Sequence, residues 1–340
     1  MIRKKLKLRW MVSILFTMAI LLSACSNEAG KAGEDKPITL SFAYELPEDH
    51  PWGHGATKFK EIVEEKTNGE VKVEVHGNGS LAASGREIQE GVKIGTIDIG
   101  ISSTPLSQMN PYLDLFSLPY IFSSREQAWE VLDGPVGDEV GKKLSEHNLT
   151  FLAYWEDGFR QITNNVRPIS EIDDFKGLKI RVPESDVRLE TFKALGSSPL
   201  PMAWSEVFTA LQQGSIDGQE NPLSVVNSSS FYDVQKYLTI SNHVYSPATL
   251  FINSSKWDSL TKDQQDIILE AAGEGRDLNR KMNQEQDEEM VKGLEGKGME
   301  VTVIEDVKPF QKATKPVWDK VSKEIGGNSQ ELIDDITKTQ

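Results

Sequence analysis

The chain has 340 residues, a formal net charge of −15 and a single cysteine. This acidic balance disfavours nucleic-acid binding, because phosphate groups require a basic protein face. One cysteine excludes an internal disulfide, and a chain of this length usually divides its hydrophobic core between two lobes.

Residues 1–24 have the pattern of a secretory signal peptide. A basic stretch precedes an apolar run at 10–22, which is shorter than the roughly 20 residues needed to span a bilayer. Cys25 follows a short segment that resembles the lipobox of bacterial lipoproteins, which implies cleavage before Cys25 and its lipidation. The alternative is an ordinary secreted protein with an incidental cysteine. Without residues 1–24 the formal charge is −20, because that segment holds five of the 37 basic residues and no acidic residue.

Strand and helix patterns alternate after a polar segment at 25–37, which we expect to be a lipid-anchored tether. The alternation predicts α/β lobes with largely parallel sheets. The predicted strands are 38–44, 71–75, 97–101 and 299–304, and the predicted helices are 54–67, 84–94, 261–294 and 309–325. Capping-box pairs mark the starts of three helices, at Ser84 with Glu87, Ser123 with Glu126, and Thr261 with Gln264.

The helix predicted at 261–294 is long and carries few apolar residues. Such a helix more plausibly bridges two lobes than fills the core of one. The predicted division is an N-terminal lobe of residues 38–157 and 247–286, a C-terminal lobe of 158–246 and 287–326, and a loosely held tail at 327–340.

Two arginines lie in otherwise apolar or turn-rich segments in the second half of the chain, Arg160 and Arg181. A buried guanidinium keeps its proton and requires an anion. Since neither arginine has an obvious acid paired with it in the sequence, we expect a small carboxylate from outside to meet them. The alternatives are that Arg181 is a solvated cation of an edge strand and that Arg160 pairs with Glu156 or Asp157.

Five sequence blocks occur in a distinctive order between residues 38 and 325. They are GVKIGTID at 91–98, LFSLPY at 115–120, GLKIRVP at 177–183, PMAWSEV at 201–207 and DGQENP at 217–222. In this order they resemble the dicarboxylate-binding type of solute-binding protein from TRAP transporters, which are tripartite uptake systems independent of ATP. The resemblance implies a two-lobed α/β fold of the type II periplasmic-binding-protein class. It also implies small and large membrane permease subunits as partners, and no cofactor.

The resemblance implies ligand-binding roles for four residues. Arg181 matches an arginine that pairs bidentately with the substrate carboxylate, and Arg160 matches a second arginine on the preceding strand. Asn221 matches an asparagine whose amide contacts the carboxylate. Trp204 lies where the family places an aromatic ring against the ligand, although some members carry phenylalanine. The alternatives are that Trp204 belongs to the core and that Asn221 only caps a helix.

The N-terminal lobe is expected to hold the other end of the ligand with residues that follow two of its strands. These candidates are Tyr44, Glu45, Trp52, His54 and Ser103, with Thr104 beside it. Hydroxyl groups and an acid there suit a hydroxylated sugar acid as well as a four-carbon dicarboxylate. No acid follows His50 as a zinc-protease motif with His54 would require, so no metal is predicted.

Three classes of function are compatible with these features. The first is a receptor that closes on a carboxylate by a hinge and delivers it to membrane subunits. The second is a surface lipoprotein that reports a ligand to a sensor kinase, and the third is an exported enzyme. No phosphate loop or nucleophile elbow is present in the sequence, which disfavours an enzyme. We therefore expect a monomeric receptor, anchored through Cys25 on the extracytoplasmic side of the cell membrane.

Overall fold

The computed structural model describes residues 36–339, apart from the side chains of Gln286 and Glu288. Within this range, the residues from Ile38 onward form one compact unit. The predicted signal peptide and Cys25 lie outside the described residues, as does nearly all of the predicted tether. Within residues 36–339, no helix combines the length and the apolar character needed to cross a bilayer.

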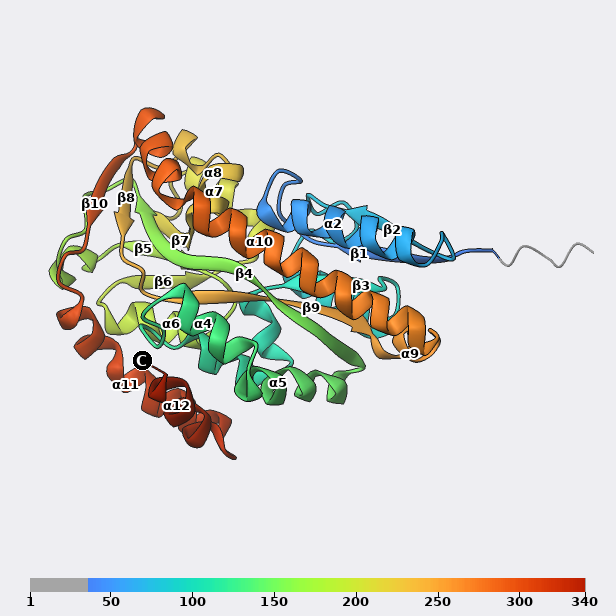
Figure 1. The fold of residues 1–340 in the computed structure, drawn as a ribbon. Helices are drawn as coiled ribbons and strands as arrows, with labels where there is room; N and C mark the ends of the chain where they lie inside the picture. The colour runs from blue at the N-terminus through green and yellow to red at the C-terminus, as the bar shows by residue number, and fades with distance from the viewer. Residues whose placement is uncertain (1–35, 340) are drawn as a thin grey trace, which may run out of the picture. The chain divides into compact units, whose positions relative to one another are not determined.

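Ten strands form a connected sheet in the order β2-β1-β3-β9-β4-β7-β5-β6, with β8 also paired to β4 and β10 paired to β8 (Figure 1). Their bounds are β1 (Ile38–Ala43), β2 (Val71–His76), β3 (Ile99–Ser102), β4 (Leu149–Asn164), β5 (Lys179–Val182), β6 (Ser198–Pro201), β7 (Gly218–Pro222), β8 (Tyr237–Ile240), β9 (Tyr245–Asn253) and β10 (Glu300–Val303).

The two long strands at the centre correct the prediction of largely parallel sheets. The pairs of β1 with β2 and β3, of β5 with β6 and β7, and of β8 with β10 are parallel. However, β9 is antiparallel to β3 and β4, and β4 is also antiparallel to β7 and β8. The sheet is therefore mixed, because β4 and β9 run in opposite directions through its middle.

Helices cover this sheet at positions close to those predicted. They are α2 (Pro51–Lys66), α3 (Gly85–Ile94), α4 (Arg125–Leu132), α5 (Pro135–Lys142), α6 (Asp186–Ala194), α7 (Val207–Gln212), α8 (Leu223–Ser228), α9 (Ser254–Asp258), α10 (Lys262–Gly296), α11 (Lys308–Ile325) and α12 (Ser329–Lys338). The caps of α3 and α10 are as predicted, at Ser84 and Thr261. Helix α4 begins one residue later than predicted, because Ser124 rather than Ser123 accepts the capping hydrogen bond.

The long helix α10 contributes to two separate hydrophobic cores. Ile268 and Ala272 near its start pack in a cluster with Phe59 of α2. Leu294 near its end belongs to another cluster, with Phe231. A helix that is buried at two places along a mostly polar length agrees with the predicted bridge. The lobe boundaries stay a prediction, because residues 38–340 form one compact unit.

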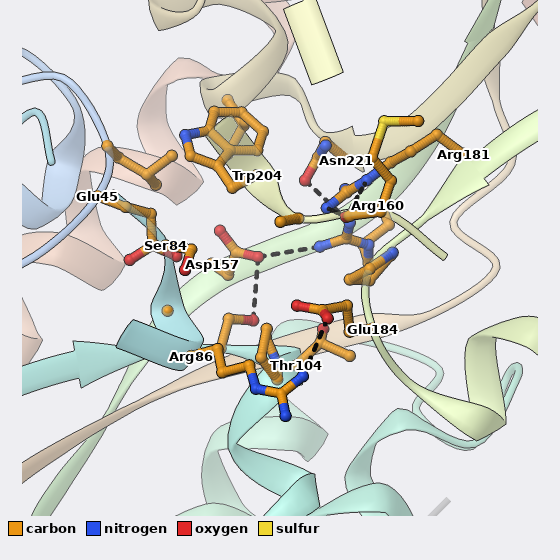
Figure 2. A pocket seen from close by; sticks show the side chains of 18 of the residues that line it. Glu45, Ser84, Arg86, Thr104, Asp157, Arg160, Arg181, Glu184, Trp204 and Asn221 are labelled. Carbon is orange, nitrogen blue, oxygen red and sulfur yellow. Dashed lines mark hydrogen bonds and ion pairs between the residues drawn. The ribbon is translucent and has the colours of Figure 1, made fainter. Parts of the chain in front are cut away.

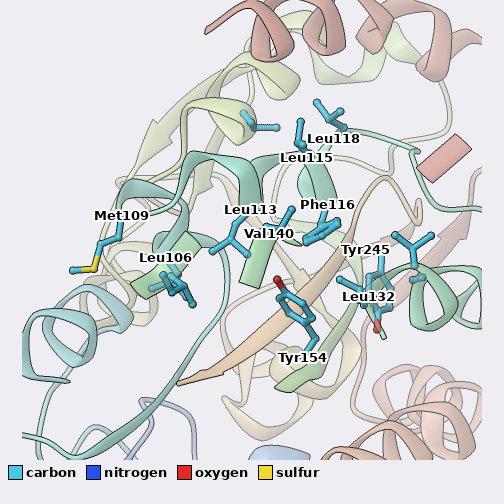
Figure 3. Close-up of a cluster of buried hydrophobic side chains, with 14 of the residues drawn as sticks. Leu106, Met109, Leu113, Leu115, Phe116, Leu118, Leu132, Val140, Tyr154 and Tyr245 are labelled. Atoms are coloured by element: carbon cyan, nitrogen blue, oxygen red, sulfur yellow. The ribbon is translucent and has the colours of Figure 1, made fainter. Parts of the chain in front are cut away.

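The expectation of a loosely held tail is wrong. Residues 329–338 form α12, whose side chains Leu332, Ile333 and Ile336 are buried in one hydrophobic cluster. Figure 3 shows Leu132 and Val140 of the same cluster. The spacing of Leu332, Ile333 and Ile336 places them on one face of a helix. Most of the other residues of this segment are polar, so the sequence analysis did not predict a helix with a buried apolar face.

Candidate functional site

A cavity of about 50 Å³ lies where several strands end (Figure 2). Its lining is Glu45, Leu46, Trp52, Ser84, Gly85, Arg86, Ser103, Thr104, Pro105, Asp157, Arg160, Arg181, Pro183, Glu184, Met202, Ala203, Trp204, Asn221 and Val225. Residues that follow β1, β3 and β5 therefore meet residues of β4 and β7. Carboxyl ends of strands are the usual binding edge of open α/β sheets. At roughly 10–15 Å³ for each water molecule, this volume holds about four water molecules.

Arg160 is buried in β4, with only 2% of its surface exposed, and is surrounded by acceptors. Its Nε donates to Oε2 of Glu220, and its Nη2 donates to Oε1 of the same carboxylate at 3.1 Å. Nη1 donates to Oδ2 of Asp157 at 3.0 Å, and Nη2 donates to Oδ1 of Asn221 at 2.9 Å. Arg160 is thus held by two internal acids and by one amide.

The expectation that Arg160 has no paired acid in the protein is therefore wrong, and the alternative of a pair with Asp157 is right. The cause is the antiparallel register of β4 and β7, in which Arg160 lies opposite Pro222 and Ile162 lies opposite Glu220. The acid that binds Arg160 most closely is 60 residues away in the sequence, so neighbouring residues gave no sign of it.

Behind Arg160 lies a buried polar network centred on Glu220. Its carboxylate is also 4.0 Å from the guanidinium of Arg188 and 3.2 Å from Nε2 of His243. Burial alone would raise the pKa of Glu220, but Arg160 and Arg188 outweigh it and hold that pKa well below its ordinary value. Burial lowers the pKa of His243. Glu220 is therefore ionised and fixes Arg160 in place.

Arg181 differs from Arg160, because no acid of the described residues lies within ion-pair distance of it. The side chain is only 4% exposed, and its Nε and Nη2 donate to the main-chain oxygen of Met202 at 3.0 and 2.7 Å. Burial lowers the pKa of Arg181 to about 10, although Glu220 opposes that effect, so the guanidinium remains charged at neutral pH. Arg181 is a buried cation in the cavity wall that is held by a carbonyl rather than by a carboxylate.

Asn221 and Trp204 both line the cavity. The amide of Asn221 accepts from Arg160 and donates to Oε1 of Gln219, and the cap of α8 is Pro222 rather than Asn221. Trp204 is partly buried and also packs against the core, with its ring centroid 5.8 Å from that of Phe231. It therefore serves both as core and as cavity wall.

The candidates from the N-terminal part of the chain divide into two groups. Glu45 and Ser103 line the cavity, as do Trp52 and Thr104. Tyr44 is buried, with its ring 6.4 Å from that of Phe42, and is not among the lining residues.

His54 is exposed on α2 and is also absent from the lining. The sequence placed His54 after the first strand and at the start of the helix predicted at 54–67, but α2 already begins at Pro51, so His54 lies within its first turn. The neighbouring His50 caps that helix and lies 3.2 Å from Oγ of Ser224.

Three charged residues of the lining were not predicted from the sequence. Asp157 accepts from Arg160 and, at 3.2 Å, from the hydroxyl of Ser103. Burial raises the pKa of Asp157 to about 6, although Arg160 acts in the opposite direction. Arg86 and Glu184 form an ion pair of 3.3 Å at the cavity wall. Glu184 directly follows the block at 177–183, which is the one signal that could have indicated it.

No group of three or more His, Cys, Asp or Glu residues within the described part of the chain is arranged to hold a metal ion. Within residues 36–339 the lining offers the guanidinium of Arg181, which has no acid partner there, an amide, an aromatic ring and several hydroxyl groups.

Comparison with known proteins gives a consistent result. Residues 42–324 match the model of the family described as bacterial extracellular solute-binding protein, family 7. The 2,3-diketo-L-gulonate-binding periplasmic protein YiaO of Escherichia coli is 33% identical over 97% of this chain and 100% of its own length. The C4-dicarboxylate-binding periplasmic protein DctP of Rhodobacter capsulatus is 34% identical over 86% of this chain and 89% of its own.

A solved structure has a closely similar fold. The sugar acid binding protein DctPAm of Advenella mimigardefordensis, in complex with galactonate, superposes with a TM-score of 0.86 at 35% identity. The match covers 90% of this chain and 99% of that protein. The sequence blocks, the two-lobed mixed α/β fold and these matches together establish that the chain belongs to family 7 of the bacterial extracellular solute-binding proteins, the receptors of TRAP transporters.

Proposed function

We propose that this chain captures a small organic carboxylate in the cavity around Arg181 and delivers it to the permease subunits of a TRAP transporter. The observation that carries the proposal is a buried guanidinium without an acid partner among residues 36–339. A planar guanidinium offers parallel donors that match the two oxygens of a carboxylate. The binding of sugar acids or C4-dicarboxylates by the relatives supports the same class of ligand.

The proposed roles follow from the contacts. Arg181 binds the carboxylate, while Asn221 and Trp204 orient the rest of the ligand. Arg160 acts as a support, because its donors are already occupied by Asp157 and Glu220. Charge-assisted hydrogen bonds contribute roughly 1.5–3 kcal/mol each, so a few of them in a closed cavity supply much of a micromolar affinity.

The proposed cycle is hinge closure without chemical turnover. The open form exposes Arg181, and a ligand that contacts both lobes shifts the population toward the closed form. A lipid on Cys25, which lies outside the described residues, would keep the receptor at the extracytoplasmic face of the cell membrane near its permease.

The test is calorimetric titration of the exported chain with a panel of organic acids, followed by the same titration of Arg181→Ala. We expect at least a tenfold loss of affinity, about 1.4 kcal/mol, because the carboxylate loses its cation. Lys179→Ala is the matched control, since Lys179 is an exposed cation on the same strand and should leave the affinity unchanged. Equal affinities of Arg181→Ala and the unmodified chain would reject the assignment. Loss of solute uptake on gene deletion tests delivery.

A further inference from the structure

The charged side chains around the cavity compensate one another, with one exception. Arg160 and Arg188 face the two acids Glu220 and Asp157. At the cavity wall, the exposed Arg86 is paired with Glu184. The other arginines of the described lining, Arg86 and Arg160, are each bonded to an acid, whereas Arg181 is not. The cavity therefore offers a single positive charge to a ligand.

Glu45 lies across the cavity from this cation. Figure 2 shows Glu45 and Ser84 on one side of the space and Arg160 and Arg181 on the other. Its Oε2 is buried and has no hydrogen-bond partner among the described residues, and Oε1 lies close to the main chain at Gly85 of α3. The charged groups that face Glu45 from the packed elements are Asp157 on β4 and Arg181 on β5.

The protonation of Glu45 follows from these surroundings. Burial raises the pKa of Glu45 to about 8, and the carboxylate of Asp157 adds to the rise, whereas a hydrogen bond from its own main chain and the charge of Arg181 act in the opposite direction. At neutral pH the side chain is therefore mostly a neutral carboxylic acid, which can both donate and accept a hydrogen bond.

Two further polar groups of the same cavity lining, Ser103 and Thr104, are uncharged hydroxyls. Oγ1 of Thr104 is buried and has no partner in the described part of the chain, and Ser103 donates to Asp157. A buried polar atom without a partner is costly, so these atoms are suited to groups that a ligand brings. Hydroxyl groups on a carbon chain would satisfy both Thr104 and a neutral Glu45.

We propose, as a refinement that rests on the function proposed above, that this site selects a hydroxylated monocarboxylate over a dicarboxylate. Arg181 binds the single carboxylate, and Glu45 and Thr104 bind hydroxyl groups at the other end. A second carboxylate beside Glu45 would find no unpaired cation in the described lining, because Arg86 is already paired with Glu184. An unpaired charge in a closed cavity is disfavoured.

The first test compares acids that differ only at the far end. Erythronate and meso-tartrate share one chain, but the first ends in a hydroxymethyl group where the second has another carboxylate. Galactonate with galactarate and gulonate with glucarate form two longer pairs. In calorimetric titrations of the exported chain at pH 7, we expect the tightest ligand of this panel to be a monocarboxylate that binds at least tenfold better than its diacid.

The second test asks whether Glu45 must be protonated. Affinity for the tightest monocarboxylate should fall by up to roughly tenfold per pH unit above pH 8, because ionised Glu45 repels the ligand. Titrations from pH 7 to 9 avoid the ionisation of Asp157, whose pKa is about 6. Glu45→Gln keeps the shape without the ionisable group and should make the affinity independent of pH. Glu48→Gln, an exposed acid of the same loop, should keep the pH dependence of the unmodified chain.

A third measurement needs no ligand. Glu45 of the unfolded chain ionises near its ordinary pKa, whereas the folded chain resists ionisation until about pH 8. Its contribution to stability is present at low pH and is lost as the pH rises through this interval. The melting temperature of Glu45→Gln relative to the unmodified chain should therefore increase from pH 5 to pH 8.

The outcomes separate this inference from the proposed function. A diacid that binds as tightly as its monocarboxylate, a flat pH profile, or no relative gain of melting temperature in Glu45→Gln would overturn the selectivity but leave carboxylate capture standing. If no acid of the wider panel binds at all, the proposed function fails and the selectivity fails with it.

Discussion

At the scale of single residues, two arginines of the same cavity have different surroundings. Arg160 is bonded to Asp157 and Glu220, whereas Arg181 is bonded to a main-chain oxygen. Removal of one partner from a buried ion pair leaves an uncompensated charge, which is strongly destabilising. Removal of a cation that has no acid partner leaves no such charge behind.

Arg160→Ala should therefore lower the free energy of unfolding by about 3–5 kcal/mol, because it leaves the buried charge of Glu220 without its closest partner. Arg181→Ala should lower it by much less, although it should weaken ligand binding more directly. Urea unfolding followed by tryptophan fluorescence measures both. Equal losses of stability in the two variants would contradict the division into a supporting and a binding arginine.

At the scale of elements, β4 is the strand that joins the two parts of the sheet. It pairs with β9 from Leu149 to Phe159 and with β7 from Arg160 onward. Its register shifts between Glu156 and Gly158, and Gly158 has a φ of +123°. This conformation is available essentially to glycine alone. It lies between Asp157 and Arg160, so the irregularity sets how both side chains reach the cavity.

Gly158→Ala should cost roughly 1–3 kcal/mol of stability, because alanine is strained at this φ even though the nearest atom to a new Cβ, in Pro222, is 3.4 Å away. It should also weaken ligand binding by displacing Asp157 and Arg160. Gly273→Ala is the matched control in α10, where a Cβ meets nothing within 4 Å. That change should leave binding unchanged and stabilise the chain by up to about 1 kcal/mol. A stable Gly158→Ala with full affinity would show that the strand tolerates an ordinary residue there.

At the scale of the whole molecule, the C-terminal helices belong to the core. The cluster that contains Leu132 and Val140 also contains Trp318 of α11 and Ile336 of α12. The indole nitrogen of Trp318 donates to the main-chain oxygen of Pro119 at 3.0 Å. Helices α11 and α12 therefore stabilise elements around residues 119–140, which are far from them in the sequence.

Leu332→Ala should lower the free energy of unfolding by about 2–5 kcal/mol, because it leaves a void in this cluster. Glu331→Gln, at the neighbouring exposed position, should change it by less than about 1 kcal/mol. Thermal and urea unfolding of both variants provide the comparison. Similar stabilities of the two would mean that α12 is not part of the cooperative core.

Much of this organisation could be predicted from local patterns. Capping pairs and apolar spacing marked α3 and α10 within one or two residues, since these signals depend on neighbours a few positions apart. The order of the sequence blocks indicated the family, which the comparisons confirm. The same blocks predicted Arg181 and Asn221, which lie together at the cavity.

The sequence by itself determined the fold class, the family and a buried arginine in need of an anion, because these follow from the types and spacing of nearby residues. Only the tertiary structure decided which arginine remains without an acid. Strand pairing brought Glu220 to Arg160 across 60 positions and left Arg181 against a carbonyl. The same folding buried Oε2 of Glu45 without a partner among the described residues, whereas the sequence shows this residue only as one acid among many. Charge compensation and desolvation depend on distances through space, and those distances exist only once the strands have paired.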